Sequence, residues 1–148
     1  MNITPNTNDN CLPQRPDRCV IVVDQDLPAG RSANAAAVIA LTIGARHPFL
    51  VGDPLIDASG FNHPGLIPIG IPVLAAAQEV LPEIRRKGLS LGCDVVDFPV
   101  EGQQTTNYQN FRGAVAAIEP DAIQYSGVAL IGQKKEIGKI VGHLKLLK

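Results

Sequence analysis

Three short runs of apolar residues constrain the fold of this chain more than any other feature. They read C-V-I-V-V at 19–23, C-D-V-V-D-F-P-V at 93–100 and Y-S-G-V-A-L-I at 125–131. Their length and their content of β-branched residues predict buried strands rather than helices. Because the segments between them are long enough to contain helices, we expect the chain to fold as an α/β domain.

Four further segments are predicted to be helical: 31–46, 75–88, 103–118 and 134–141. The first is rich in alanine, which has the highest helix propensity, and either Ser32 or Asn34 could cap its start. Pro82 is expected either to interrupt the second helix or to begin its stronger part, 82–87, because proline breaks a helix interior but suits the first helical turn. In the third segment, Tyr108 and Phe111 fall on one helical face and are expected to lie in the core.

Two segments carry prolines and glycines that limit what they can form. The stretch 49–65 predicts short extended pieces joined by turns. The stretch 66–74 alternates like a strand, but Pro68 and Pro72 cannot donate to a ladder, so we expect it at the edge of the sheet or just outside it. The apolar segment 144–147 is expected to return to the sheet. Together these features predict a three-layer α/β/α domain around a small mixed, mostly parallel sheet.

Length and composition indicate one ordinary globular domain. The chain has 148 residues, 45% of them hydrophobic, and a formal net charge of −1. Residues 1–16 are rich in Asn and Pro and are expected to form a disordered tail, which leaves 17–148 as the domain. The sequence contains no apolar run long enough to span a membrane and no secretory signal, so we expect a cytoplasmic protein.

The cysteines and histidines do not predict a metal or cofactor site. Cys11, Cys19 and Cys93 form no C-x-x-C pair. The latter two each open an apolar run, and we expect them to be buried thiols of a protein in a reducing compartment. The three histidines are scattered without the spacing of metal ligands. We therefore assign no cofactor and no metal.

Both ends of the domain resemble type II peptidyl-tRNA hydrolases. The string V-G-H-L-K-L at 141–146 differs only in its first residue from the T-G-H-L-K-L that closes that family, and D-Q-D-L-P-A-G-R at 24–31 is similar to the family's D-L-K-M-G-K-G-K. The middle, including F-L-V-G at 49–52 and Y-S-G-V-A-L at 125–130, resembles a bacterial family called domain of unknown function 2000. The combined resemblance implies a peptidyl-tRNA hydrolase II-like fold.

Most of the groups that the hydrolase family uses do not carry over to this chain. The resemblance implies roles for the three lysines of the family's D-L-K-M-G-K-G-K string, which fall here on Pro28, Arg31 and Ala33. Arg31 keeps a cation but holds its proton too tightly to act readily as a shuttle. The resemblance also implies an aspartate and a threonine, matched by Asp97 and, across a gap, by Thr105. Hydrolysis of peptidyl-tRNA is therefore not the preferred function, and tRNA stays an alternative partner.

The candidate site lies where the loops 24–31 and 97–106 follow the carboxyl ends of two strands. Ligands of open α/β sheets bind there, so we expect the two loops to converge on one cleft. Gly30 would let the backbone turn tightly before a helix whose start attracts an anion, and Arg31 would add a fork of donors. Asp26 and Asp97 could accept from donor groups of the ligand or pair with Arg31. The ligand-binding candidates are Asp26, Gly30, Arg31, Ser32, Gln104 and Thr106. The catalytic candidates, if the protein is a hydrolase, are Asp97, Arg31 and Thr105.

Three classes of function remain open from the sequence. We prefer a binding module for a small anionic ligand or a partner protein, because the proton-transfer groups are the ones lost. A hydrolase of another ester or amide would use Asp97 as base or to position water. RNA binding would require the lysines in 134–148 to share a face with Arg31. By analogy with the hydrolases, a homodimer is expected through helix 31–46 or the edge near 66–74.

Overall fold

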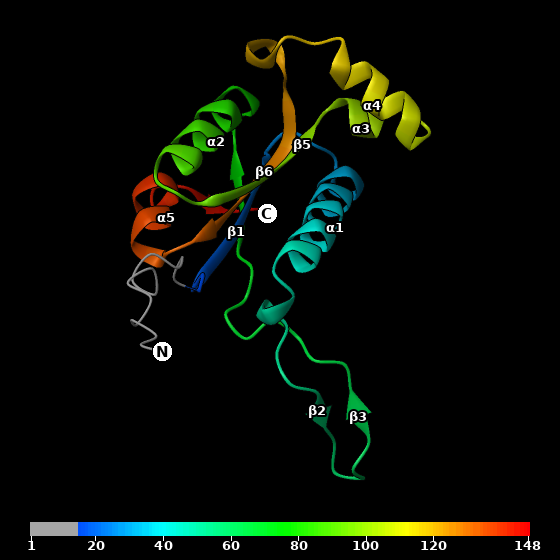
Figure 1. Ribbon diagram of the computed structural model, residues 1–148, viewed down its shortest axis with the longest axis vertical. Coiled ribbons are helices and arrows are strands. Elements are labelled where there is room, and N and C mark those ends of the chain that lie inside the picture. The colour runs from blue at the N-terminus through cyan, green and yellow to red at the C-terminus, as the bar shows by residue number, and fades with distance from the viewer. Residues whose placement is uncertain (1–14) are drawn as a thin grey trace, which may run out of the picture.

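A five-stranded sheet with helices on both faces forms the body of the molecule (Figure 1). The computed structural model describes residues 15–148, so the predicted tail lies almost entirely outside the described residues. The strands are β1 (Arg18–Asp24), β4 (Val73–Ala76), β5 (Asp94–Pro99), β6 (Tyr125–Gly132) and β7 (Lys145–Leu146). They are arranged in the order β5-β6-β1-β4-β7, so the three predicted runs form three adjacent strands.

The sheet is mixed but mostly antiparallel, and the prediction of a mostly parallel sheet is wrong. Only the pair β1–β4 is parallel, whereas β1–β6, β5–β6 and β4–β7 are antiparallel. β6 lies between β1 and β5, so β5 pairs with the strand that follows it in the sequence and not with β4, which precedes it. A buried apolar run has the same composition in either direction, and the pattern therefore carries no information on strand polarity.

β4 is shorter and more interior than the sequence indicated. It begins at Val73, directly after Pro72, and both prolines of the 66–74 stretch lie outside it. The expected position just outside the sheet is confirmed for 66–72, but Val73 and Leu74 are not at the edge, because β7 pairs with β4 through Leu74 and Leu146 and forms the edge itself. The predicted return of the chain end to the sheet is thereby confirmed.

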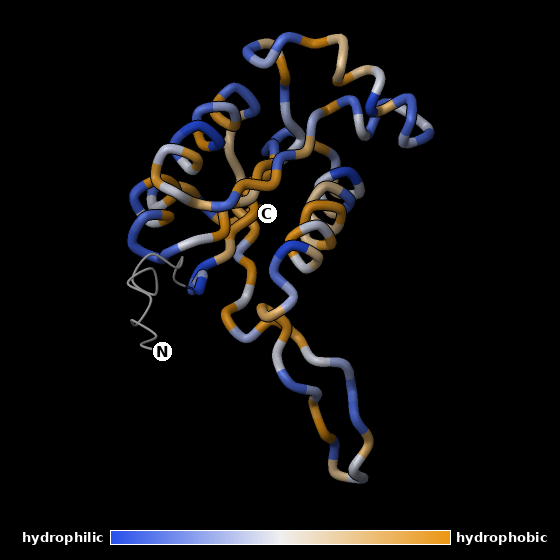
Figure 2. The backbone as a smooth tube through the Cα atoms, in the orientation of Figure 1, coloured by the Kyte–Doolittle hydropathy of each residue, from blue (hydrophilic) through white to orange (hydrophobic). Residues whose placement is uncertain are grey.

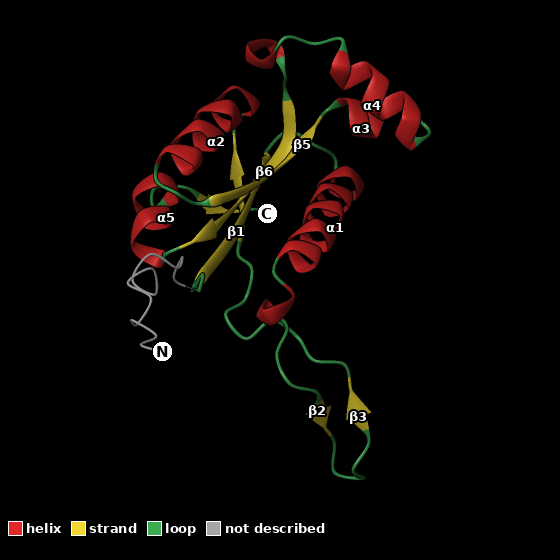
Figure 3. Ribbon diagram, viewed as in Figure 1, coloured by secondary structure: helices red, strands yellow, loops and turns green. Residues whose placement is uncertain are grey.

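The helices pack on both faces of the sheet, as Figure 3 shows by colour. They are α1 (Ala29–Arg46), α2 (Leu81–Ser90), α3 (Glu101–Gln104), α4 (Tyr108–Ala116) and α5 (Lys134–Val141), with 3₁₀ turns at Pro48–Leu50 (η2), Gln78–Val80 (η3) and Pro120–Ala122 (η4). α1 covers one face, and α2 and α5 cover the other (Figure 1). None of the described helices is both long and apolar enough to cross a membrane.

β1 is buried on both faces, which explains its continuous apolar sequence. Val20 and Val22 contact the cluster beneath α2 and α5, whereas Ile21 and Val23 contact the cluster beneath α1. Figure 2 shows the same concentration of apolar residues along the central strands. Cys19 is fully buried beside them, and burial raises the pKa of its thiol to about 11. The expectation that Cys19 and Cys93 are buried thiols is confirmed.

Two predicted helices differ from the sequence-based expectation at their starts. α1 begins at Ala29 after Pro28, without a side-chain cap, so neither Ser32 nor Asn34 has the expected role. The predicted helix 103–118 is divided into α3 and α4, because Thr105 is extended and Asn107 caps α4 by accepting from the Asn110 backbone N–H at 2.8 Å.

The break before α4 also changes which aromatic residues lie in the core. Tyr108 is 72% exposed, so its assignment to the core is wrong. Phe111 is half-buried and packs against Phe98, with ring centroids 6.1 Å apart. Gly102 permits this packing, because a Cβ atom there would overlap both phenylalanine rings.

Residues 51–72 leave the body as a long arm that ends in a small hairpin (Figure 1). The hairpin pairs β2 (Leu55–Ile56) with β3 (Asn62–His63), which agrees with the predicted extended pieces and turns. Asp57 fixes the turn by accepting from the backbone and hydroxyl of Ser59 and from the His63 ring. At the base of the arm a Cβ on Gly65 would overlap the Gly52 carbonyl, so the two chain segments can cross only where Gly65 has no side chain.

Candidate functional site

The loops after β1 and β5 meet at the end of the sheet where β1 finishes and β6 begins. The link is Gln103 of α3, whose amide nitrogen donates to the Arg31 carbonyl at 2.9 Å and to Asn34 Oδ1 at 3.1 Å. The hydroxyl of Ser126, at the start of β6, donates to Gln103 Oε1 at 3.4 Å. The two loops therefore meet as predicted, although no residue of 24–31 lines the pocket described below, and we call this end of the sheet the α1 rim.

The buried polar residues of the described chain all lie at the α1 rim: Asp24, Ser32 and Ser126. Asp24 ends β1 and accepts from the Asp26 backbone N–H at 2.9 Å, which closes the turn that follows. The Ser32 hydroxyl donates back to the Leu27 carbonyl at 3.4 Å. These groups are engaged with the chain itself, so they shape the rim rather than present free atoms to a ligand.

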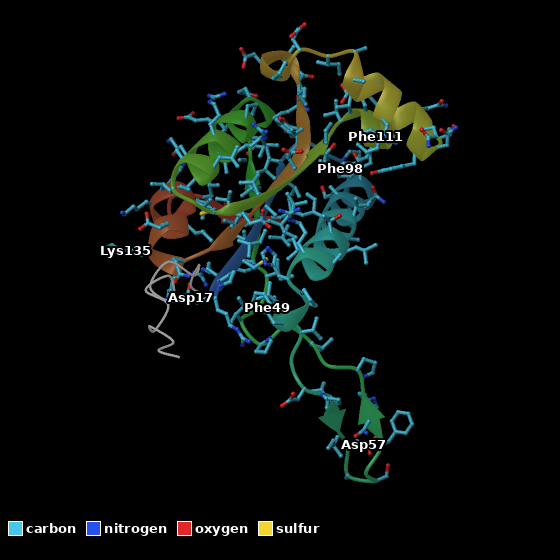
Figure 4. The ribbon with its side chains drawn as sticks, in the orientation of Figure 1. Asp17, Phe49, Asp57, Phe98, Phe111 and Lys135 are labelled. Atoms are coloured by element: carbon cyan, nitrogen blue, oxygen red, sulfur yellow. The ribbon has the colours of Figure 1, made fainter. Side chains whose placement is uncertain are left out.

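A pocket of about 320 Å³ opens between α1 and the α3–α4 segment. We call it the rim pocket. Its walls are apolar where Phe98 and Phe111 meet, and Figure 4 labels both rings between β5 and α4. The lining residues are Asn34, Val38, Phe98, Gly102, Thr105, Thr106, Asn107, Tyr108 and Phe111.

The polar groups that line the rim pocket are left mainly as donors. Asn34 Oδ1 already accepts from Gln103, and Asn107 Oδ1 accepts from the Asn110 backbone. Each of these two asparagines therefore keeps an amide NH₂ for another partner. No carboxylate lines the pocket. A ligand rich in acceptor atoms, such as a carboxylate or a phosphate, suits this set of groups.

Asp97 lies on the opposite face of the sheet from the rim pocket. Side chains alternate along a strand, and its neighbours Val96 and Phe98 both face α1. Asp97 instead accepts from Arg85 Nε of α2 at 2.7 Å, a hydrogen bond that raises the pKa of Arg85. It therefore does not pair with Arg31, and the sheet separates these two catalytic candidates.

The third catalytic candidate, Thr105, does line the rim pocket, but its hydroxyl donates to the Glu101 carbonyl at 2.8 Å. The structure thus gathers Thr105 and Thr106 at one pocket, with Arg31 close by through its carbonyl, and leaves Asp97 outside. Asp26 and Gln104 are exposed and do not line the pocket.

Gly30 does not form the tight turn expected from the sequence. It lies inside the first turn of α1, its φ is not positive, and open space surrounds the position of its missing Cβ. The helix start is therefore accessible, but the glycine is not required by the local backbone.

The sequence-based reasoning did not select Asn34, Gln103 and Ser126, which hold the α1 rim together, nor Arg85, which pairs with Asp97 on the other face. Gln103 stands in the G-Q-Q-T string beside the chosen Gln104. Only the helical turn of α3 decides which of the two amides faces α1. The pairing of Arg85 with Asp97 joins α2 to β5, and no local pattern predicts it.

Of the five lysines in 134–148, the three on α5 do not share a face with Arg31, whereas Lys145 of β7 lies opposite Ala75 on the α1 side of the sheet. α5, which carries Lys134, Lys135 and Lys139, packs with α2 on one face of the sheet, whereas α1 packs on the other. Figure 4 labels Lys135 on that far side of the molecule. The single basic face that RNA binding would require is therefore not formed by these residues.

Within residues 15–148, no group of three or more His, Cys, Asp or Glu side chains is placed to hold a metal ion.

Comparison with known proteins places the chain among proteins of unknown function. The profile of a family described as "Protein of unknown function (DUF2000)" matches residues 17–148. A solved structure of a protein of unknown function from Agrobacterium tumefaciens strain C58 is similar at a TM-score of 0.79 and 25% identity, over 87% of this chain and 96% of that one. No curated protein matches the chain.

Proposed function

We propose that this chain, which belongs to the DUF2000 family of proteins of unknown function, is a binding module for a small anionic ligand. The ligand would occupy the rim pocket, with its acidic group at Asn34 and Asn107 and its apolar part on Phe98 and Phe111. The observation that carries this proposal is the set of side-chain amides whose oxygens are already engaged. Each of these amides has its NH₂ group left for a guest, whereas one lone pair of its oxygen is already used, so a carboxylate or phosphate is favoured.

Two further features of the α1 rim support an anionic ligand. The first N–H groups of α1 lack a side-chain cap and an acidic neighbour in the first turn. Arg31 lies one helical turn from Asn34, on the same side of the helix, and is exposed to solvent. Both features place positive potential beside the pocket.

Benzoate is a suitable probe, because it combines a carboxylate with a ring of the size that the two phenylalanines can contact. We expect it to perturb the amide NMR signals of the rim pocket. Asn34→Asp should weaken benzoate binding by about tenfold or more, since it places a carboxylate opposite the ligand at nearly constant volume. Gln109→Glu, on the exposed side of α4, adds the same charge and should leave binding unchanged. Benzoate binding that is equally strong in Asn34→Asp would refute the proposal.

The resemblance to type II peptidyl-tRNA hydrolases favours hydrolysis as a second candidate function. Asp97 would act on water as the base, next to the buried Tyr125, whose pKa is raised by burial and by Asp97. Its ion pair with Arg85 at 2.7 Å opposes that role, because the pair must open before the carboxylate can accept a proton. An assay of the wild type on peptidyl-tRNA, with Arg31→Ala and Asp97→Ala, separates the two candidates. Activity that both variants lose would replace the binding module by a hydrolase.

We further propose that the protein forms a homodimer in which the arm of one copy covers α1 of the other. Between Arg31 and Arg46, α1 carries no charged residue. Its outer face exposes Val38 and Leu41, the latter by 78%. The arm exposes an equally apolar set, formed by Val51, Leu55, Ile56, Phe61 and Leu66.

The dimensions of the two surfaces match. α1 has 18 residues and is therefore about 27 Å long. One edge of the arm, from Gly52 to Asp57, reaches about 20 Å when extended. The exposed apolar side chains of α1 and the arm together offer an area on the order of the 800 Å² that each partner contributes to a standard interface. A twofold axis would use both surfaces of both copies, which satisfies them without a different partner.

Light scattering after size-exclusion chromatography tests the homodimer. We expect a dimer for the wild type and monomers for Leu41→Glu and Phe61→Glu, because each variant buries a charge in the proposed contact. Leu89→Glu, on the half-exposed side of α2, is the matched control and should stay dimeric. A monomeric wild type, or a dimer that survives both substitutions, would contradict the arm-on-helix arrangement.

A further inference from the structure

A second cavity, of about 570 Å³, lies at the end of the sheet opposite the α1 rim. Its volume falls in the range of roughly 300–1,000 Å³ that is usual for small-molecule sites. We call it the His47 cavity. Its described lining is formed by Arg15, Pro16, His47, Phe49, Leu91, Gly92, Cys93, Asp94, Ile131, Gly132, Gln133 and Glu136. It shares no residue with the rim pocket.

The imidazole of His47 is held in one orientation by a charged network. Its Nε2 lies 2.6 Å from Asp94 Oδ2, and Arg46 donates from Nε and Nη2 to the two Asp94 oxygens at 2.8 Å each. The hydrogen bonds from Arg46 lower the pKa of the Asp94 carboxyl, so at neutral pH it is ionised and can only accept. His47 Nε2 must therefore donate, and Nδ1 of the neutral ring is left as an acceptor.

The walls around His47 are mainly apolar. Phe49 meets the His47 ring edge to face, with centroids 5.8 Å apart, and the Arg15 guanidinium lies 5.1 Å from the Phe49 centroid. Leu91 and Ile131 add aliphatic surface. Such a lining removes water from an apolar ligand and favours its transfer into the cavity.

The charged and reactive groups of the cavity limit which ligands it suits. Asp94 is neutralised by Arg46, and Glu136 is paired with Lys139 at 3.4 Å, so neither carboxylate is free to attract a cation. The Arg15 guanidinium lies over the Phe49 ring, and the acceptor on His47 does not favour an anion. Burial raises the pKa of the Cys93 thiol, so this cysteine is protonated at neutral pH and is not a ready nucleophile.

We infer that the His47 cavity binds a small neutral molecule that joins an apolar ring to one hydroxyl or N–H donor, with that donor directed to His47 Nδ1. The inference goes beyond the proposed function, because it concerns a different site and a ligand of different charge. The ring would lie against Phe49 and Leu91. The network of Arg46 and Asp94 would act on the ligand through His47, by fixing which ring nitrogen is the acceptor.

Phenol and toluene are matched probes for this site, since they share a ring and differ in the hydroxyl donor. In titrations of the full chain followed by amide NMR, we expect phenol to shift signals of the cavity lining, including Gly92 and Gly132. His47→Phe should weaken phenol by about fivefold, the factor that one neutral hydrogen bond contributes, and leave toluene unchanged.

Leu91→Trp tests the cavity without touching the charged network. Leu91 is 41% exposed at the end of α2, so a larger side chain there can fill the cavity without entering the core. We expect this variant to lose both probes, whereas Asn34→Asp in the rim pocket should keep both. The inference is overturned if phenol does not shift the cavity signals up to its solubility limit. Unaltered binding in Leu91→Trp, or equal loss of both probes in His47→Phe, would also overturn it.

Discussion

Asp94 and Asp97 lie on the same strand, yet they serve opposite ends and opposite faces of the molecule. Three positions separate them, an odd number, so their side chains project to different sides of β5. Asp94 faces α1 and receives two hydrogen bonds from Arg46 and one from His47 beside the His47 cavity. Asp97 faces α2 and receives one from Arg85.

The comparison shows that an acidic residue at a strand end is not by itself an indication of a site. Asp97 matched a pattern of residues, but the structure places it in an ion pair away from the rim pocket. Asp94 matched no pattern, yet it orients the imidazole of the second cavity. Partners on other elements decide the role, and these partners follow from strand parity and helix packing.

The largest effect is expected from a substitution of Gly102, which should disrupt the packing of the α1 rim and leave the His47 end of the sheet unchanged. Gly102→Ala would push a Cβ against Phe98 and Phe111. We expect a loss of about 1–3 kcal/mol in the free energy of unfolding, as for overpacking in a filled core. Urea unfolding measures this loss.

NMR shifts of the same variant should be confined to α3, α4 and the adjoining part of α1. Shifts of similar size at His47 would show that the two ends of the sheet are not independent. Gly113→Ala in α4, where open space surrounds the glycine, is the control and should not destabilise the protein.

Asp94→Ala should produce the next largest effect. It removes the acceptor of three side-chain hydrogen bonds, and we expect a loss of about 1–2 kcal/mol, limited because the Arg46 guanidinium is half exposed and screened by solvent. The expected signature in NMR spectra is a change in the chemical shifts of the His47 ring, because Asp94 no longer fixes its tautomer. Unchanged stability and unchanged His47 signals would remove the basis for the fixed imidazole.

The pH dependence of stability sharpens the prediction for Asp94. The pKa of the Asp94 carboxyl is lowered in the folded state. Its contribution to the free energy of unfolding is therefore fully present above the unfolded-state pKa of about 4 and is lost as the pH falls through the folded-state pKa. The wild type should therefore lose stability below about pH 4 more steeply than Asp94→Asn. Equal acid slopes in the two proteins would contradict the lowered pKa.

Asp97→Asn should have the smallest effect of the three. It keeps the size of the side chain and replaces one charged hydrogen bond to a partly exposed arginine, so we expect a loss below about 1 kcal/mol. Benzoate binding in the rim pocket should not change, because Asp97 lies on the other face. A clear loss of benzoate binding would place Asp97 back in the site.

The sequence by itself determined the parts that depend on local chemistry. The apolar runs at 19–23 and 125–131 became the two central strands, since a run of β-branched residues without polar alternation must be buried on both faces. Alanine content predicted α1, and proline and glycine content predicted the arm. The meeting of the two loops at one end of the sheet also followed from the order of strands and helices.

Only the tertiary structure decided strand direction, side-chain partners and the second cavity. The insertion of β6 between β1 and β5 made the sheet mostly antiparallel, and the partners Arg85 and Arg46 come from other elements, 12 and 48 residues away from Asp97 and Asp94. In the sequence His47 showed no relation to another site residue, and only the packing of α1 on the sheet places it next to Asp94 of β5. Local patterns report burial and propensity, whereas pairing between distant segments depends on how the elements pack, and this is the physical reason for the division.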